Sequence, residues 1–215
     1  MAAISAARKA AFGVLMGVER GHSHADDLLR SKSMDSNSYR SADYFNLIDW
    51  TGNKNNWAVG APPQNTGNNA ANLSTMTALL NNSGLAVAAT DIGHTASVFQ
   101  DFLRIRRDTS MFRLKTAAAI ASCVSFPDQG AQQPGLIVMR ISGATGCGDS
   151  KYQSIVVLFN ANKVAQSFAL PGYGSAVVGL HALQANGSDA VVKDAHFAAG
   201  TFSVPARTTA VFVQP

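Results

Sequence analysis

Short runs rich in β-branched residues dominate the chain after about residue 116, and they constrain its fold more than any other feature. Gly, Pro, Asn and Asp separate the runs, and no helical pattern lies between them. They cover residues 135–141, 154–159, 167–170, 176–183, 190–193, 201–204 and 209–213. Several strands at this spacing are typical of an antiparallel sandwich of about 100 residues. We therefore predict an all-β antiparallel sandwich over residues 116–215.

The first half of the chain has a different sequence pattern, with two helical segments and an asparagine-rich region between them. Apolar residues at helical spacing predict one helix over residues 5–18 and another that begins at Thr90 or Asp91 and ends near Asp108. Between them, eleven asparagines fall within residues 37–82, and this composition favours turns over regular elements. Long loops inside compact proteins are usually functional or disordered, and the interspersed aromatic residues indicate a packed one. Residues 26–82 are therefore predicted to form a long functional loop.

Composition excludes several classes of protein. Of the 215 residues, 47% are hydrophobic and 14% charged, which indicates a folded chain with a core. The net charge of +4 is spread without a dense basic stripe, so we expect no nucleic-acid partner. No apolar run reaches the roughly 20 residues that cross a bilayer, so we expect no membrane span. The basic, alanine-rich residues 1–16 fit either an organelle transit peptide or an ordinary helix.

The two cysteines, Cys123 and Cys147, are too few for a disulfide framework. They form neither a CxxC pair nor a zinc-finger spacing. We interpret them as buried thiols of the core. A single disulfide between them is the alternative, because their neighbourhoods resemble adjacent strands.

The densest group of metal-binding side chains lies in residues 22–27, which read HSHADD. Two imidazoles and a carboxylate at this spacing, His22, His24 and Asp26, could hold zinc. A two-metal site needs further ligands, and none of the other three histidines lies in a suitable context. We therefore interpret the segment as a polar turn and expect no metal and no cofactor. A zinc-dependent hydrolase using this HxHxD motif is the alternative.

Asp26 and Arg30 are four residues apart and would share one face of a helix. An exposed ion pair within the helix is the simplest interpretation. The functional alternative is a sugar contact, in which the carboxylate accepts hydrogen bonds from hydroxyl groups and the planar guanidinium donates to them.

The sequence around Asp26 and Arg30 resembles that of a known family. Residues 28–39, 41–46 and 49–50 read LLRSKSMDSNSY, SADYFN and DW. These segments resemble the pullulanase and limit dextrinase branch of the α-amylase superfamily. The similarity continues in order and spacing through residues 55–63, 112–114, 134–140, 154–157, 159–160 and 202–213. It spans almost the whole chain and is much more specific than a single motif.

The resemblance implies an α+β chain made of two parts. Residues 1–115 would be the C-terminal remnant of a (β/α)8 barrel, and residues 116–215 the family's C-terminal antiparallel sandwich. The loop after a barrel strand lies on the face where barrel active sites are built, so the asparagine-rich segment would border a substrate cleft.

The family hydrolyses α-1,6 linkages in pullulan, starch or limit dextrins with retention, using an Asp nucleophile and a Glu acid/base. By the resemblance these carboxylates belong to earlier barrel strands, so we assign no catalytic residue here. We expect the C-terminal part of such a hydrolase, inactive alone, with an α-glucan as its partner. Asp26 and Arg30 match the family's sugar-contacting pair. Relatives are secreted or cytosolic in bacteria and plastidial in plants, so the compartment stays open.

A non-catalytic carbohydrate-binding or structural module is the second functional hypothesis. Tyr44, Trp50 and Trp57 lie in the loop segment and could serve as stacking surfaces for sugars. Aromatic side chains in loops equally often form a local core.

Overall fold

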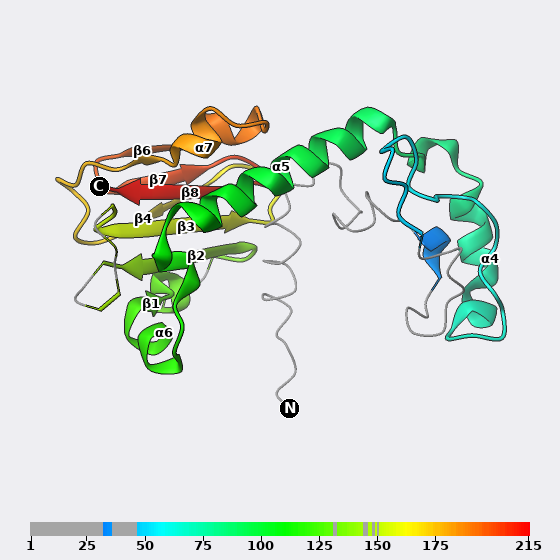
Figure 1. The fold of residues 1–215 in the computed structure, drawn as a ribbon, viewed down its shortest axis with the longest axis horizontal. Coiled ribbons are helices and arrows are strands. Elements are labelled where there is room, and N and C mark those ends of the chain that lie inside the picture. The colour runs from blue at the N-terminus through cyan, green and yellow to red at the C-terminus, as the bar shows by residue number, and fades with distance from the viewer. Residues whose placement is uncertain (1–31, 36–46, 131–132, 144–145, 148, 150) are drawn as a thin grey trace. The chain divides into compact units, whose positions relative to one another are not determined.

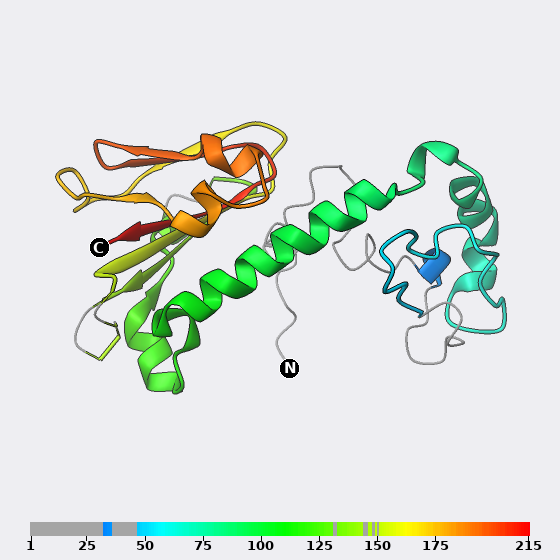
Figure 2. The same ribbon diagram turned by 45° about the horizontal axis from the view of Figure 1, so that its top comes forward.

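The computed structural model describes residues 32–35, 47–130, 133–143, 146–147, 149 and 151–215. The chain divides into two compact units, of which the described parts are residues 32–96 and residues 97–215. The boundary lies inside the helix α5 (Ala89–Asp108), which Figure 2 shows as one uninterrupted helix. The helix predicted over residues 5–18 lies outside the described residues.

The first unit contains helices and turns. Its elements are η1 (Lys32–Met34), α4 (Asn69–Leu80), η2 (Ser83–Leu85) and the beginning of α5. Helix α4 lies where a continuous loop was predicted, so that part of the prediction is wrong. The segment between Gly67 and Asn81 holds Ala, Leu and Met, which favour a helix, and Met76 buries its side chain. The loop was predicted from the asparagine content of the whole region, which does not reflect the helix-favouring residues of this segment.

Helix α5 confirms the second predicted helix to within two residues. It begins at Ala89, one residue before the predicted cap, and ends at Asp108 as predicted. The Asp91 carboxylate accepts a hydrogen bond from the Ala88 N–H at 3.2 Å, which satisfies a backbone donor at the helix start. Arg106 and Arg107 occupy the last turn, where positive charge suits the helix dipole.

The second unit adds short helices and two sheets. The helical elements are η3 (Ser110–Arg113), α6 (Ala117–Cys123), η4 (Pro127–Gly130), α7 (Ala182–Ala185) and η5 (Val191–Asp194). The strands are β1 (Val124–Ser125), β2 (Leu136–Ser142), β3 (Ser154–Asn160), β4 (Gln166–Ala169), β5 (Gly179–Leu180), β6 (His196–Ala198), β7 (Thr201–Val204) and β8 (Thr209–Gln214).

All strand pairs in the two sheets are antiparallel. The five-stranded sheet has the order β1-β2-β3-β8-β5, and the three-stranded sheet has the order β4-β7-β6. Figure 1 shows β2, β3 and β8 side by side. Helices followed by antiparallel sheets confirm the predicted α+β class.

The period-two pattern of the central strands divides their side chains between two cores. Val156 and Leu158 of β3 belong to the core shared with the three-stranded sheet, whereas Ile155 and Val157 belong to the core on the opposite face. Every residue of β3 is buried, which explains its uninterrupted apolar sequence. The register pairs Leu158 with Ala210 of β8.

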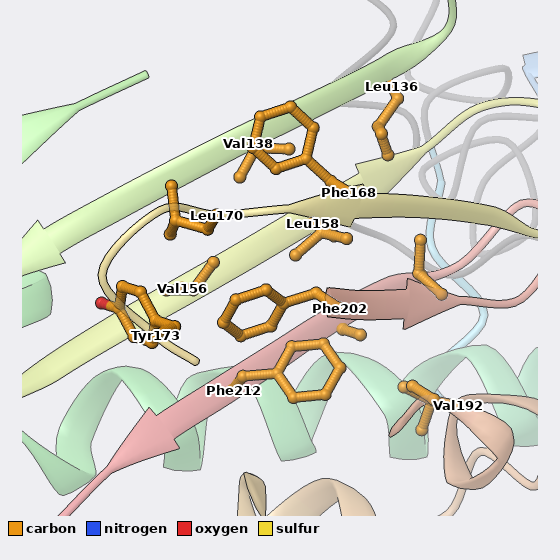
Figure 3. Close-up of a cluster of buried hydrophobic side chains, with 13 residues drawn as sticks. Leu136, Val138, Val156, Leu158, Phe168, Leu170, Tyr173, Val192, Phe202 and Phe212 are labelled. Carbon is orange, nitrogen blue, oxygen red and sulfur yellow. The ribbon is translucent and has the colours of Figure 1, made fainter. Parts of the chain in front are cut away.

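Phe202 is the centre of the core between the two sheets (Figure 3). This fully buried ring packs edge-on against Phe212, with ring centroids 5.1 Å apart, and against Tyr173 at 5.5 Å. It also contacts Phe197 at 4.8 Å. Edge-to-face aromatic pairs add stabilisation beyond the area that they bury. The sheets are therefore joined by aromatic packing from β6, β7 and β8.

The opposite face of the five-stranded sheet is covered by helical segments. Ile105 of α5 and Met111 of η3 pack with Ile155 and Val157 of β3. Cys123 and Cys147 join this second core as a disulfide, with Cα atoms 5.4 Å apart. The interpretation of these cysteines as free thiols is therefore wrong, and the alternative of a disulfide is confirmed. Buried thiols and a buried disulfide look alike in sequence, because only the fold determines whether the two Cα atoms meet.

Two of the predicted strand assignments need correction, and one helix was not predicted. Within residues 176–183 only Gly179–Leu180 is a strand, and α7 begins at Ala182 because His181 caps it. Residues 190–193 are mostly the turn η5, since the Asp189 carboxylate accepts from the Val191 N–H at 2.8 Å and closes a local turn. The helix α6 was not predicted. Thr116 caps it by accepting from the Ala119 N–H at 3.1 Å.

The assignment of residues 1–115 to a barrel remnant is not tested by this geometry. The described residues 32–35 and 47–115 form helices and turns, and a barrel strand was expected only before residue 26. The boundary at residues 115 and 116 stays a prediction.

Candidate functional site

The predicted sugar-contacting pair, Asp26 and Arg30, lies outside the described residues. The same is true of His22 and His24 in the alternative zinc motif, and of Tyr44. The description begins at Lys32, two residues after Arg30.

Ser33 and Asp35, three and five residues after Arg30 in the sequence, are both buried. Ser33 is fully buried and adopts left-handed backbone angles, with φ 48° and ψ 39°. Its Oγ donates to the Asn56 carbonyl at 2.6 Å and accepts from the Val59 N–H at 3.3 Å. A non-glycine residue keeps such angles only where the surroundings enforce them. Ser33 thereby holds η1 against the loop around Asn56.

Asp35 fixes the other end of this segment to α4. Its Oδ1 accepts a hydrogen bond from the Asn69 Nδ2 at 2.8 Å, and both side chains are buried. The same Asn69 amide donates to the Pro63 carbonyl at 2.8 Å. A buried amide that joins three chain segments requires all of its partners in place, because an unsatisfied polar group inside a protein costs free energy. The chain beside Arg30 is thus positioned by buried polar contacts.

A hydrogen-bonded turn over Asp49–Gly52 exposes Trp50. The Gly52 N–H donates to the Asp49 carbonyl at 3.0 Å, and Gly52 takes a positive φ of 71°. The Asp49 carboxylate accepts from Thr51 Oγ1 at 2.7 Å and from the Lys54 N–H at 3.2 Å. The hydrogen bond from the Thr51 hydroxyl is the largest contribution that lowers the pKa of Asp49. Trp50 itself is 90% exposed.

The second tryptophan has a different environment. Trp57 is half-buried, and its backbone N–H donates to Asn55 Oδ1 at 3.2 Å. The indole Nε1 is buried without a hydrogen-bond partner among the described residues. Trp57 is therefore a poor candidate for a sugar-stacking surface, whereas Trp50 is accessible.

A second polar cluster joins three elements of the sheet unit. We call Asp108, Lys151, Tyr152 and His181 the Asp108 cluster. The Asp108 carboxylate accepts from the Tyr152 hydroxyl at 2.8 Å and from the Lys151 ammonium. His181 Nε2 lies 3.1 Å from Asp108 Oδ2, and its Nδ1 accepts from the Leu183 N–H at 3.1 Å. Because Nδ1 is an acceptor, Nε2 carries the proton of a neutral ring and donates to Asp108.

Electrostatics support this proton assignment. Burial lowers the pKa of His181 below its ordinary value, and the attraction of Asp108 offsets only part of that effect. Burial raises the pKa of Asp108, but the hydrogen bonds from Lys151 and Tyr152 outweigh it and keep the group ionised. Both ring nitrogens of His181 are engaged, by Asp108 and by the Leu183 amide. The Asp108 cluster therefore holds α5, α7 and the β2–β3 connection together, and its histidine is not arranged as a general base.

Asp149 makes a parallel connection next to this cluster. It accepts from the Ser110 N–H at 2.8 Å, from the Thr109 hydroxyl and from the Lys151 N–H at 3.0 Å. Partial burial raises the pKa of Asp149, but these hydrogen bonds outweigh it and lower the pKa to about 2. Sequence reasoning missed both groups because their partners lie 39 to 73 residues apart.

Within the described residues, no group of three or more His, Cys, Asp or Glu side chains could hold a metal ion. Among the helices that the structure describes, none combines the length and apolar character needed to cross a lipid bilayer. The zinc hypothesis concerns residues 22–27 and stays untested.

Comparison with known proteins shows where this chain has counterparts. A family model described as "Alpha-1,6-glucosidases, pullulanase-type, C-terminal" matches residues 52–215. The chain is 39% identical over 198 residues to pullulanase 1, chloroplastic, of Arabidopsis thaliana, covering 88% of this chain and 20% of that protein. It is 30% identical over 196 residues to a pullulanase of Klebsiella pneumoniae, covering 88% of this chain and 17% of that protein.

The solved structures agree with these sequence matches. The maltotriose complex of PulA from Klebsiella pneumoniae superposes with a TM-score of 0.78 at 26% identity, covering 97% of this chain and 23% of that one. PulA from Klebsiella oxytoca gives a TM-score of 0.76 at 25% identity, covering 97% of this chain and 20% of that one. The chain spans about a fifth of the length of the proteins that it matches.

Proposed function

This chain belongs to the pullulanase-type α-1,6-glucosidases, as part of their C-terminal region, and we propose that it serves a retaining hydrolase that debranches pullulan, starch or limit dextrins. In this role it supplies part of the rim of the substrate cleft and a β-sandwich that stabilises the catalytic barrel. The proposal assigns it no catalytic carboxylate, so the chain alone does not cleave a glycosidic bond. The match of residues 52–215 to the family model carries the proposal.

The proposed cleft rim consists of Asp26, Arg30 and the loop that follows them. Asp26 would accept hydrogen bonds from sugar hydroxyls, and Arg30 would donate to them through its planar guanidinium. The contacts of Ser33 and Asp35 support this role, because they hold the chain three and five residues beyond Arg30. A guanidinium on an anchored segment loses less conformational entropy when it binds.

The sandwich would act as a structural support for the barrel. Its two cores and the disulfide give it a hydrophobic interior of its own. Helix α5 begins in the first unit and ends against the second core, where Ile105 is buried. The Asp108 cluster fastens the last residue of that helix. These contacts within the sheet unit favour a structural role over a role in chemistry.

A chimera tests the proposal. The matching C-terminal segment of the Klebsiella pneumoniae pullulanase is replaced by this chain, and pullulan hydrolysis is measured for the chimera and for the chain alone. We expect an active chimera and an inactive chain. Maltotriose release by the chain alone, or a folded chimera without activity, would contradict the proposal.

Substitutions within that chimera test the assigned residues. Asp26→Asn and Arg30→Lys should each raise KM about 10-fold or more, which corresponds to losing one charge-assisted hydrogen bond of about 1.5–3 kcal/mol. Arg106→Lys is the matched control, because Arg106 is exposed at the end of α5. An unchanged KM in both site variants would remove Asp26 and Arg30 from the substrate contacts.

A further inference from the structure

Trp50 is the most exposed of the large hydrophobic side chains for which the structure gives an accessibility, at 90%. Tryptophan is mostly buried in folded proteins, because its ring has a large apolar area. Leu47 and Ile48, close by, are exposed to 56% and 38%. The structure therefore presents an indole ring to solvent, together with two smaller apolar side chains.

The turn beneath Trp50 is held by several hydrogen bonds. The Asp49 carboxylate accepts hydrogen bonds from the Thr51 N–H, the Thr51 hydroxyl and the Lys54 N–H. Asn53 Nδ2 donates to Thr51 Oγ1 at 3.0 Å. On the other side, Asn56 Nδ2 donates to the Leu47 carbonyl at 3.0 Å. A ring carried by such a turn is ordered before a ligand arrives, which lowers the entropic cost of binding.

Exposed polar residues follow Trp50 in the sequence. Thr51, Asn53 and Lys54 are all exposed, and they supply hydroxyl, amide and ammonium groups within four residues of Trp50. A pyranose ring presents apolar C–H groups on its faces and hydroxyl groups around its edge. An exposed indole followed by exposed polar residues is complementary to this pattern, since stacking would cover the C–H face while nearby polar groups would bind hydroxyls.

We infer that Trp50 is a stacking platform for a glucose unit of an α-glucan chain. The inference rests on the proposed function, because a loop that borders a glucan cleft brings Trp50 within reach of an extended substrate. It adds a contact separate from Asp26 and Arg30. Trp57 is not part of it, since it is half-buried.

Titration of the full chain with maltotriose, followed by tryptophan fluorescence, tests this inference. The chain has two tryptophans, so Trp57→Phe leaves Trp50 as the only indole. We expect a saturable change with a Kd of about 1–10 mM, the range for one stacked sugar at an open surface. The change should persist in Trp57→Phe and disappear in Trp50→Ala, whose circular dichroism should match the parent chain. Cellotriose, with β-linkages, is the ligand control and should bind at least 5-fold more weakly.

Three results would overturn the inference. The first is the absence of a saturable fluorescence change at about 50 mM maltotriose, and the second is a change that survives Trp50→Ala. The third is concentration-dependent self-association that Trp50→Ala abolishes, which would make Trp50 a protein contact. The test is separate from that of the proposed function: an active chimera without a Trp50 response removes only the stacking platform, and a Trp50 response with an inactive chimera removes only the proposed function.

Discussion

His181 Nε2 donates to the carboxylate of Asp108 across 3.1 Å, although the two residues are 73 positions apart in the sequence. The pair joins the cap of α7 to the last residue of α5. Because His181 Nδ1 simultaneously accepts from the Leu183 amide, the ring is held in its neutral form. We therefore expect the stability of the sheet unit to depend on pH.

Stability should fall when the pH drops below the ordinary histidine pKa of 6.5. In that range the unfolded chain binds a proton at His181, whereas the folded chain resists it, so protons favour unfolding. The facing groups Asp108, Lys151 and Tyr152 keep their protonation states between pH 5 and about 7.5. Urea unfolding at these two pH values should show a lower midpoint at pH 5. His181→Asn should reduce the difference between the two urea midpoints, while His196→Asn, at an exposed site, should leave that difference unchanged. An equal difference in the parent chain and both variants would contradict the neutral state assigned to His181.

Asp149 should contribute stability at neutral pH through its hydrogen bonds to Thr109, Ser110 and Lys151. Asp149→Ala should lower the free energy of unfolding by about 1–3 kcal/mol at pH 6. Since the pKa of Asp149 is about 2, the contribution should decrease as the pH falls below the ordinary aspartate value of 3.8. Denaturant titrations of both chains at pH 6 and pH 3 measure the difference. Asp194→Ala, at an exposed position, serves as the control and should change stability by less than about 0.5 kcal/mol.

Asn69 should hold the loop unit together. Asn69→Ala removes the donor to Asp35 and to the Pro63 carbonyl, so it should destabilise this unit by about 1–3 kcal/mol. Hydrogen exchange should become at least 10-fold faster in residues 32–35 and 55–69, while strands β3 and β8 stay protected. Asn72→Ala is matched to it, because Asn72 is exposed on the same helix and donates only to the neighbouring Asn68 carbonyl. Unchanged exchange near Asp35 would show that the segment is positioned by other contacts.

The disulfide should stabilise the sheet unit. Cys123 and Cys147 are separated by 24 residues, and closing a loop of that length is worth about 3.5 kcal/mol in the chain-entropy account. Because the chain has only two cysteines, any effect of a reductant on the unfolding midpoint reports this bond. The midpoint should fall on reduction and also in Cys123→Ala/Cys147→Ala, which should no longer respond to reductant. Identical midpoints with and without reductant would argue against the bond.

Patterns confined to a few neighbouring residues were readable from the sequence. The runs at 154–159, 201–204 and 209–213 became β3, β7 and β8 with boundaries within a residue, because the period of two and the β-branched side chains are local properties. The helix ending at Asp108 was predicted for the same reason. Failures occurred where a single polar side chain reshaped the backbone, as Asp189 did at η5 and His181 at α7.

By itself, the sequence determined the α+β class, the antiparallel strands and the family, because these depend on local periodicity and on motifs in order. Only the tertiary structure decided that Cys123 meets Cys147, that Asp108 receives His181 and Tyr152, and that Trp50 is exposed while Trp57 is half-buried. The physical reason is that burial and hydrogen-bond pairing between distant residues depend on the packing of whole elements. Two tryptophans seven residues apart in one loop therefore look alike in the sequence, and only Trp50 is almost fully exposed to solvent.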